Sequence, residues 1–478
     1  MARCLIALAL TPIFAAAALA QAPKVGDPPE AQNMRLVGYN DLQARSAYQP
    51  TVHKQGERYI AYIGHHGGTP EVPKPINKLT GQAEFNGTSI IDVTDPANPK
   101  YLKHIPGLEG NYEDGGAQMV RVCDGKGLAK ADASKTYMLR VFGGRAHEIW
   151  DTTDPANPAL VSRIGGDLKD THKNWWECDT GIAYLVSGAA GWRTRRMTQI
   201  YDLSDPAKPA HIRDFGIPGQ EPGTAGEVPT ELHGGISTGP QGNRVYFGYG
   251  TNKGGILQIL DRKKLLEGPK EPTPDNLRDP VIAQFQMSPL VGAHTVYPLG
   301  KIKIPEFSGD KFGAERDMIM IVDESLVNEC GTGETRQMVW FVDATVEKYP
   351  MVVSNFTPAA GNFCGRGGRF GAHSSNESMA PVVRGKLAFI TWFNAGVRAI
   401  DIRNPYRPRE AGYFIPSITE ATDKRCVKVE GKDQCKIAIQ SNNIETDDRG
   451  YIYVVDRANT GMHILEVTGE AREIAGIK

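Results

Sequence analysis

The sequence predicts an all-β fold, a seven-bladed β-propeller with four-stranded blades. The prediction starts from a recurring signature in which an alternating apolar strand ends in an acidic residue, followed by a proline-containing turn and another apolar strand. Its clearest copies are SIIDVTDPANPKYL from residue 89, EIWDTTDPANPALV from 148, QIYDLSDPAKPAHI from 199 and AIDIRNPYRPREAG from 399. Alternation buries one face of a sheet, and Asp-Pro or Asn-Pro marks the connection between strands.

Weaker copies extend the series to seven. They are LQILDRKK from residue 257, VWFVDATVEKYPMVV from 339 and HILEVTGE from 463. Aligned on the acidic position, the repeats carry Asp92, Asp151, Asp202, Asp261, Asp343, Asp401 and Glu466. These acids recur at intervals of 51 to 82 residues, which is room for the four short strands of a propeller blade.

The seventh repeat has no fourth strand, because the chain ends soon after Glu466. The segment MRLVGYN, residues 34 to 40, reads like the fourth strand of the other repeats. We expect this N-terminal strand to complete the last blade and close the ring, which would leave no exposed sheet edge.

The repeat signature, a hydrophobic residue and an acid followed by Val/Leu, Thr/Ser and Asp-Pro-x-x-Pro, resembles that of the LVIVD repeat family of secreted bacterial β-propellers. The first three copies match closely, the sixth in part and the others weakly, yet the register covers nearly the whole mature chain. The resemblance implies the fold. It implies little about activity, because propellers host many unrelated functions.

The N-terminus predicts a secretory signal peptide over residues 1–20. One early arginine precedes an apolar run, and the small residues Ala18 and Ala20 suit cleavage after Ala20. A single propeller domain, residues 21–478, would then be periplasmic or secreted. No other run reaches the roughly 20 apolar residues of a membrane span. The formal charge of -1 gives no sign of a nucleic-acid partner.

Six cysteines remain after cleavage, an even number in a chain bound for an oxidising compartment. Cys426 and Cys435 flank a segment able to turn a hairpin, so a disulfide between them is expected. The spacing leaves the pairing of the other four open: Cys123, Cys178, Cys330 and Cys364.

Histidines recur where the innermost strand of each blade is expected to begin. From blade one to blade seven, the aligned position reads His53, Gln118, His172, His233, His294, His373 and Asn443. In a propeller this position lies at one end of the central channel, so the histidines are expected to form a cluster at the hub.

This cluster predicts a mononuclear metal site held by His172, His233, His294 and His373, with His53 as a fifth candidate. Neutral imidazoles suit iron or copper, with zinc as an alternative, and argue against calcium and magnesium. Ligating histidines donate their second N–H to an acceptor, for which the candidates are Glu177, Glu231, Glu377 and Glu445.

Two functions fit these features. The first is a metal-dependent oxidoreductase whose small-molecule substrate enters over Trp176, Arg366 and Arg369. The alternative is a non-enzymatic binding or scaffold propeller that contacts a protein, glycan or cell-wall partner. In the alternative the histidines are structural, because duplication of one blade would copy a histidine that merely bonds its neighbour. No hydrolase or nucleotide-binding motif is present.

Overall fold

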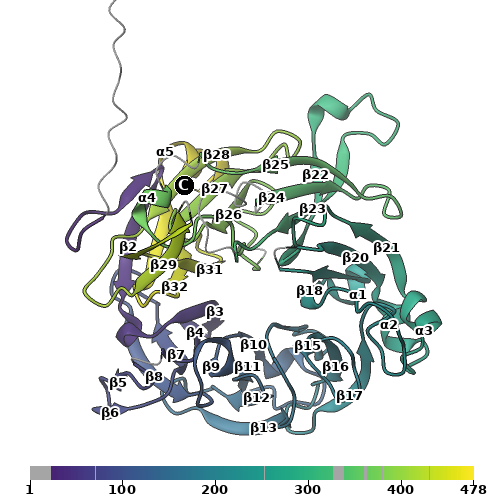
Figure 1. Cartoon of the computed structure of the whole chain (residues 1–478), viewed down its shortest axis with the longest axis horizontal. Helices are drawn as coiled ribbons and strands as arrows, with labels where there is room; N and C mark the ends of the chain where they lie inside the picture. The colour runs from purple at the N-terminus through teal and green to yellow at the C-terminus, as the bar shows by residue number, and fades with distance from the viewer. Residues whose placement is uncertain are drawn as a thin grey trace, which may run out of the picture.

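A computed structural model describes residues 23–69, 72–251, 253–326, 338–359, 363–378, 380–429 and 431–477. The predicted signal peptide and Cys330 lie outside these residues. Seven small antiparallel sheets stand in a ring around a central axis, so the predicted seven-bladed propeller is confirmed (Figure 1). Within the described residues, no helix has the length and apolar character needed to cross a membrane.

Blades one to five each contain four main strands that follow one another along the chain and are added in that order. The strands of blades one to three are β3 (Ala47–Gln55), β4 (Arg58–His66), β7 (Gly87–Asp92) and β8 (Lys100–Pro106); β10 (Val120–Asp124), β11 (Thr136–Phe142), β12 (Ala146–Asp151) and β13 (Ala159–Gly165); and β14 (Asn174–Trp176), β15 (Ile182–Ser187), β16 (Met197–Asp202) and β17 (Ala210–Phe215). Those of blades four and five are β18 (Leu232–Ser237), β19 (Arg244–Tyr249), β20 (Ile256–Asp261) and β21 (Val281–Gln286); and β22 (Thr295–Lys303), β23 (Glu315–Val322), β24 (Val339–Asp343) and β25 (Met351–Phe356).

Blades six and seven are completed by strands from the N-terminus. Blade seven contains β31 (Ser441–Thr446), β32 (Ile452–Asp456) and β33 (Gly461–Val467), and its outer strand is β2 (Met34–Asn40). The predicted closure is therefore confirmed. Blade six contains β26 (Leu387–Thr391), β27 (Val397–Asp401) and β28 (Arg409–Ile415), and it also receives an N-terminal strand, β1 (Glu30–Gln32), that the sequence did not reveal. The N-terminal segment thus fastens two blades.

Asp261 caps the helix that follows it and Glu466 pairs with Arg35, whereas the other five repeated acids build the turn that follows their strand. In each case Oδ1 accepts a hydrogen bond from the backbone N–H two residues later, an arrangement that fixes a tight turn. The bonds join Asp92 to Thr94, Asp151 to Thr153, Asp202 to Ser204, Asp343 to Thr345 and Asp401 to Arg403, with lengths of 2.7 to 3.1 Å. Repetition of the acidic residue in the sequence therefore repeats the same turn in the structure.

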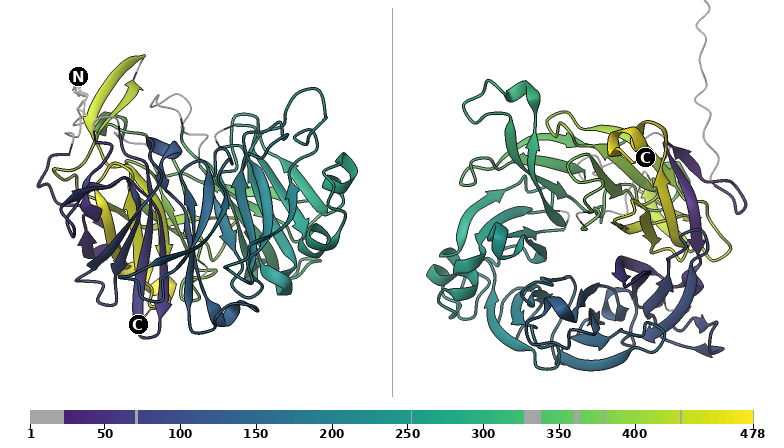
Figure 2. Two further views of the ribbon diagram at one scale, coloured as in Figure 1. Left: turned by 90° about the horizontal axis from the view of Figure 1, so that it is seen from below. Right: turned by 180° about the vertical axis from the view of Figure 1, so that it is seen from behind.

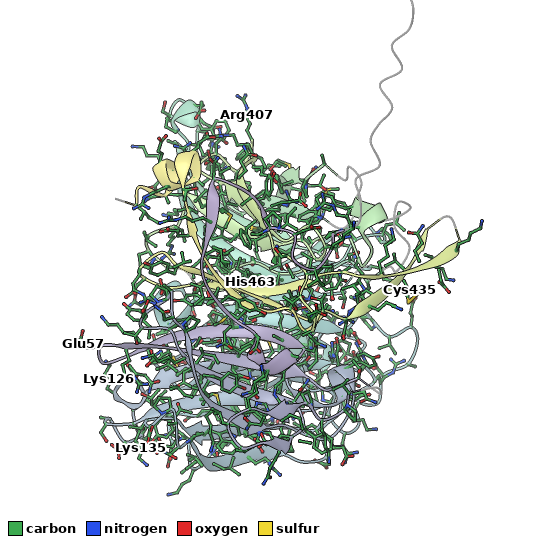
Figure 3. The ribbon with its side chains drawn as sticks, turned by 90° about the vertical axis from the view of Figure 1, so that its left-hand side faces the viewer. Glu57, Lys126, Lys135, Arg407, Cys435 and His463 are labelled. Carbon is green, nitrogen blue, oxygen red and sulfur yellow. A yellow bond between two sulfur atoms is a disulfide. The ribbon has the colours of Figure 1, made fainter. Side chains whose placement is uncertain are left out.

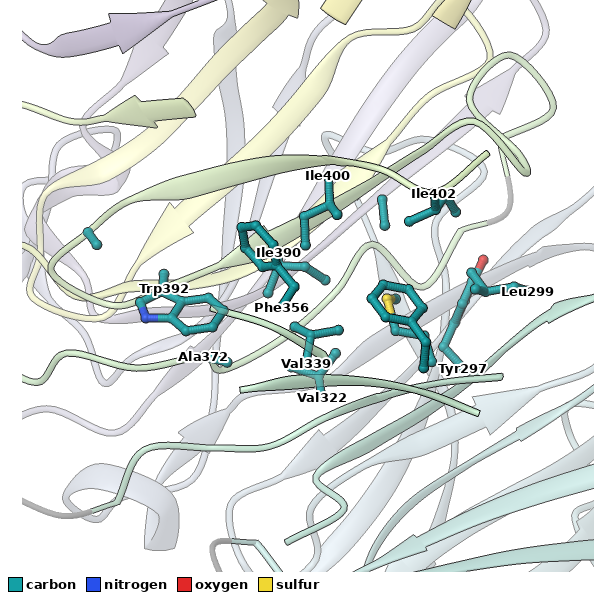
Figure 4. Packing of buried hydrophobic residues seen from close by; sticks show 14 of the residues in the cluster. Tyr297, Leu299, Val322, Val339, Phe356, Ala372, Ile390, Trp392, Ile400 and Ile402 are labelled. Carbon is teal, nitrogen blue, oxygen red and sulfur yellow. The ribbon is translucent and has the colours of Figure 1, made fainter. Parts of the chain in front are cut away.

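Apolar side chains fill the space between adjacent blades. The largest cluster joins blades five and six, where Phe356 and Trp392 meet edge to face beside Ile390 and Val339 (Figure 4). Burial of these side chains stabilises the fold by about 25 cal/mol for each Å² removed from water. Strands such as β26 and β27 are buried on both faces, so the expectation of one buried face per sheet is wrong for them: each blade packs between two neighbours.

Short elements decorate the ring. They are β5 (Ile76–Asn77), β6 (Gln82–Ala83), β9 (Gly116–Ala117), α1 (Gly239–Gly242), α2 (Arg262–Glu267), α3 (Pro274–Arg278), α4 (Phe363–Arg366), α5 (Gly469–Ala475), η1 (Leu42–Ala44), η2 (Tyr112–Asp114), η3 (Gly125–Gly127) and η4 (Pro305–Phe307). The hairpin of β29 (Lys424–Val429) and β30 (Lys432–Ile437) rises from the face opposite the C-terminus (Figure 2, left).

Two disulfides lie in the described residues. Cys426 pairs with Cys435 across the hairpin, as expected. Cys123 on β10 pairs with Cys178, which follows β14, and this second bond ties blade two to blade three. Sequence spacing left that pairing open because the partners are 55 residues apart and meet only in the assembled ring.

Candidate functional site

The structure brings four of the predicted histidines together at the hub of the propeller. His172, His233, His294 and His373 are buried, and consecutive rings lie 4.7, 3.7 and 4.7 Å apart between centroids. Each comes from a different blade. His172, His233 and His294 lie at or just before the innermost strand, and His373 lies in an extended segment that pairs with β26 through the Ser375–Ile390 bridge. Side chains separated by 201 residues in the sequence thus form one continuous row of tilted and edge-to-face rings, termed the histidine stack.

Hydrogen bonds fix which ring nitrogen carries the proton in the first part of this stack. The amide of Gln118, a donor, lies 2.9 Å from His172 Nδ1, so that nitrogen accepts and His172 Nε2 carries the proton. His172 Nε2 lies 2.9 Å from His233 Nε2 and donates to it. His233 Nδ1 in turn donates to the backbone carbonyl of His294 at 2.7 Å.

His373, at the other end of the stack, is also fully bonded. Its Nδ1 donates to the carbonyl of Asn442 at 2.7 Å, and its Nε2 accepts from Arg457 at 3.0 Å. His294 differs. Its Nδ1 contacts the hydroxyl of Thr295 at 3.0 Å, while its Nε2 has no hydrogen-bond partner in the described structure.

All four imidazoles are held neutral. Burial lowers the pKa of each of them well below 6.5, and neighbouring cations or imidazoles lower it further. After burial, Lys173 lowers the pKa of His233, and His233 followed by Lys173 lowers that of His294. A neutral imidazole keeps a lone pair on one ring nitrogen, which is the atom that binds a metal ion.

A buried carboxylate, Glu324, completes the cluster. It follows β23, and its two oxygens lie 3.5 Å from His294 Nε2 and 3.5 Å from His373 Nε2. Burial raises the pKa of Glu324, while Arg457, 3.8 Å away, opposes that shift. Glu324 lies outside the histidine position that recurs between repeats, so the sequence pattern does not mark it.

His53 does not join the cluster, which corrects the alignment in blade one. Its Nε2 lies 2.8 Å from Asp124, in a partly exposed ion pair. Tyr48 occupies the hub instead, with its ring 5.6 Å from that of His172 and 5.8 Å from that of His373. Five residues of extended strand span roughly 16 Å, so His53 is carried far along β3 from the hub.

The four glutamates expected to support the histidines are bonded elsewhere. Glu177 binds Arg262 at 2.6 Å, and Glu231 binds Arg195 at 2.5 Å. Glu445 accepts from the backbone N–H of Ser378.

Glu377 lies in the channel with Lys173, 2.8 Å away, and with Arg121. Burial alone would raise the pKa of Glu377, but these two cations lower it to about 2. Backbone carbonyls, rather than these glutamates, accept the hydrogen bonds from Nδ1 of His233 and His373.

The three residues expected to contact a substrate are dispersed. Trp176 is buried in the core between blades two and three. Arg366 binds Glu30 at 2.5 Å, beside the N-terminal strand. Arg369 lines the mouth of the central channel, where burial lowers its pKa to about 10.

The mouth is a cavity of about 660 Å³ on the face that carries the β29–β30 hairpin. Its charged lining consists of Arg195, Arg369, Lys424, Arg425, Arg457, Glu113, Asp114 and Asp170. His66 also lines it, and the ring of Tyr48 lies 4.7 Å from that of His66, so the floor of the mouth adjoins the histidine stack.

No family model matches the chain, and no curated protein matches it significantly. The LVIVD resemblance therefore stays a prediction. Among solved structures, the chain is similar to Sqt1 from Chaetomium thermophilum, with a TM-score of 0.50, 10% identity and coverage of 91% of this chain and 99% of that one. A second match is Sqt1 from the same organism bound to the N-terminus of the ribosomal protein L10, with a TM-score of 0.47, 11% identity and coverage of 90% and 99%. At this identity the likeness shows the fold alone.

The expectation of a metal-dependent oxidoreductase with iron or copper held by four histidines is corrected. The comparisons supply a propeller fold and nothing that supports an oxidoreductase. The interior offers a physical reason as well. The lone pair of His172 accepts from Gln118 and that of His373 accepts from Arg457, so neither lone pair is free for an ion shared by the four rings.

Proposed function

We propose that this protein is a non-enzymatic binding propeller that holds an acidic segment of a partner protein in its channel mouth. The observation that carries the proposal is the lining of the mouth, where five basic residues face three acidic ones around a cavity of about 660 Å³. A cavity of this size admits a few side chains of an extended peptide. The partner's identity rests on this charge pattern, because the likeness to Sqt1 is one of fold.

The acidic residues of the mouth are largely compensated by local ion pairs. Glu113 lies 2.9 Å from Arg196, and Asp170 lies 3.7 Å from Arg195. Three of the basic residues are paired as well, Arg195 with Glu231, Arg425 with Asp423 and Arg457 with Glu324. The exposed Lys424 on the hairpin is therefore the positive charge that a ligand meets first.

The hairpin extends the basic surface outward. Its cationic residues are Lys424, Arg425, Lys428, Lys432 and Lys436. Lys424 lines the mouth and is exposed, while Lys428 pairs with Asp433 at 3.2 Å. The disulfide holds the two strands together and so keeps this wall in place, far from Lys126 on the opposite face (Figure 3).

Exposed apolar groups at the rim suit a protein partner. Tyr112 is 56% exposed and Leu326 is 38% exposed, and both line the mouth. Large apolar or aromatic side chains surrounded by charged groups are typical anchor points in protein interfaces. A peptide with acidic residues around one apolar side chain would satisfy both parts of the surface.

The test measures binding of fluorescent peptides by anisotropy at low and physiological salt. One probe is a ten-residue peptide rich in glutamate with a central leucine, and the other carries lysine in place of glutamate. We expect only the acidic peptide to bind, with binding weakened by salt because the attraction is screened. The double variant Lys424→Glu/Arg425→Glu should bind about 10-fold more weakly or worse.

Lys126→Glu is the matched control, because it reverses a charge of the same kind on the far face, and it should bind as the wild type does (Figure 3). The proposal fails if the wild type binds neither peptide. It also fails if the two peptides bind equally, or if both variants weaken binding to the same extent.

A further inference from the structure

Beneath the mouth, one group of side chains has the donor atoms of a metal site. Of the described residues, only His233, His294 and Glu324 bring three such donors within 4.8 Å of one another, and all three are buried. His233 lies on β18 in blade four, whereas His294 and Glu324 flank β22 and β23 in blade five. An ion held here would join two blades at the hub.

The ring of His233 is oriented as a ligand. Its Nδ1 proton is fixed on the carbonyl of His294 at 2.7 Å, which leaves the lone pair on Nε2. Ligating histidines typically donate their second N–H to such an acceptor. His172 currently donates to that lone pair, and the hydroxyl of Tyr48, 3.3 Å from His172 Nε2, is available to receive the donated proton instead.

The ring of His294 supplies the second, independent observation. Its Nε2 is completely buried, lacks a hydrogen-bond partner in the described structure and faces Glu324 at 3.5 Å. Leaving a buried polar atom unpaired costs about 1–3 kcal/mol, so such atoms in a native protein require an explanation. The hydroxyl of Thr295 can accept a hydrogen bond from the N–H at His294 Nδ1, 3.0 Å away, and in that tautomer the lone pair is on Nε2.

From this geometry we propose that His233 Nε2, His294 Nε2 and a carboxylate oxygen of Glu324 bind one divalent ion of the zinc type. Two imidazoles and a carboxylate form a common zinc ligand set, with bonds of about 2.0–2.2 Å. Tetrahedral bonds of that length place donors about 3.4 Å apart, close to the 3.5 Å between His294 and Glu324. The ion neutralises the buried carboxylate and fastens blade four to blade five; this role is separate from peptide binding in the mouth.

The test uses full-length protein without a polyhistidine tag, freed of metal by a chelator. Zinc chloride is titrated by calorimetry, and bound zinc is counted by elemental analysis after gel filtration. We expect one zinc per chain and a higher melting temperature with zinc, because a ligand that binds the folded state stabilises it. Glu324→Gln and His294→Gln should each weaken binding by more than about 100-fold.

Glu445→Gln is the matched control, since Glu445 is a buried carboxylate in another part of the interior and its variant should keep the zinc. The proposal is overturned if the wild type binds no zinc, or if both cluster variants bind zinc as the wild type does. Should the variants fail to fold, the visible spectrum of the cobalt(II)-loaded wild type decides. Intense tetrahedral bands support the site, and weak six-coordinate bands contradict it.

Discussion

His172 and His233 form a direct hydrogen bond between their Nε2 atoms, 2.9 Å long and fully buried, across the boundary of blades three and four. His172→Leu removes the donor to His233 Nε2 and leaves the Gln118 amide with only the Thr171 carbonyl, 3.5 Å away. Each buried group left unpaired costs about 1–3 kcal/mol. We therefore expect the free energy of unfolding to fall by about 2–5 kcal/mol, measured by denaturant titration.

His53→Leu is the comparison for that variant, because the sequence alignment gave His53 the same hub position. The structure places it in a partly exposed ion pair with Asp124. Such pairs contribute about 0–1 kcal/mol. Equal destabilisation by the two variants would contradict the hub described here.

Acid should destabilise the protein through buried histidines outside the hub, and His147 on β12 provides a clean case. Burial lowers its pKa to about 3, and neither of its ring nitrogens has a partner in the described structure. In the unfolded chain a histidine has a pKa of about 6.5, so as the pH falls below 6.5 the unfolded state binds a proton that the folded state does not. His147 therefore has no effect on the free energy of unfolding above pH 6.5, and it lowers that free energy progressively as the pH falls from 6.5 to 3.

The expected slope is about 1.4 kcal/mol per pH unit for this one group. His147→Leu cannot take up the proton, so the stability lost between pH 7.5 and pH 5 should be about 2 kcal/mol smaller in the variant. Denaturant titrations at the two pH values measure this difference. His211→Leu, which alters an exposed histidine, should keep the wild-type dependence; a wild-type slope in His147→Leu would refute the assignment.

The two described disulfides should differ in what their removal costs. Cys123–Cys178 spans 55 residues and joins two blades, whereas Cys426–Cys435 spans 9 residues within one hairpin. Loop-closure entropy grows with the length enclosed, giving about 4 kcal/mol for the first and about 3 kcal/mol for the second. The hairpin stands apart from the ring, so opening its disulfide should loosen the hairpin alone.

Calorimetry on two serine double variants tests this contrast. Cys123→Ser/Cys178→Ser should lower the main melting temperature, while Cys426→Ser/Cys435→Ser should leave it nearly unchanged and weaken binding of the acidic peptide. A reversed order of melting temperatures would show that the hairpin is part of the cooperative unit.

The sequence predicted the fold well because the recurring acids act locally. The side chains of Asp92 and Asp151 accept hydrogen bonds from the backbone N–H two residues later, so the same short sequence forms the same turn in each blade. The closing strand β2 was also predictable, since the last repeat lacked a partner. Strand β1 was not predictable, because its three residues, Glu30–Gln32, are all exposed and show no alternation of apolar and polar side chains. They form a strand only by pairing with β28.

The hub was predicted only in part, because it depends on contacts between distant segments. The spacing of repeats placed His172, His233, His294 and His373 in one layer. It misplaced His53, because β3 runs for nine residues with an irregular register near Ala47 that alignment of letters does not show.

Glu324 lies outside the repeated motif altogether, so no periodic signal marked it. The same holds for the mouth, whose lining comes from loops of several blades and from a hairpin in the connection between blades six and seven. Loops between repeated strands vary freely, and the repeat therefore carries no information about the surface they build.

Ring closure depends on a close backbone approach at Gly38, where β2 has an irregular register against β33. A Cβ atom at this position would lie 2.0 Å from the carbonyl oxygen of Pro96, in the turn of blade one. That oxygen belongs to the backbone, so either β2 or the turn must move. Gly38→Ala should therefore lower the free energy of unfolding by about 1–3 kcal/mol, the usual cost of overpacking.

Hydrogen exchange locates the effect, because displacement of β2 should expose the amides of β33 more than those of blades two to five. Gly309→Ala serves as the control, since a Cβ atom there meets nothing within 4 Å and its stability should match that of the wild type. If Gly38→Ala were as stable as Gly309→Ala, the junction between the N-terminal strand and blade one would be loose, and closure of the ring would depend on the β2–β33 hydrogen bonds alone.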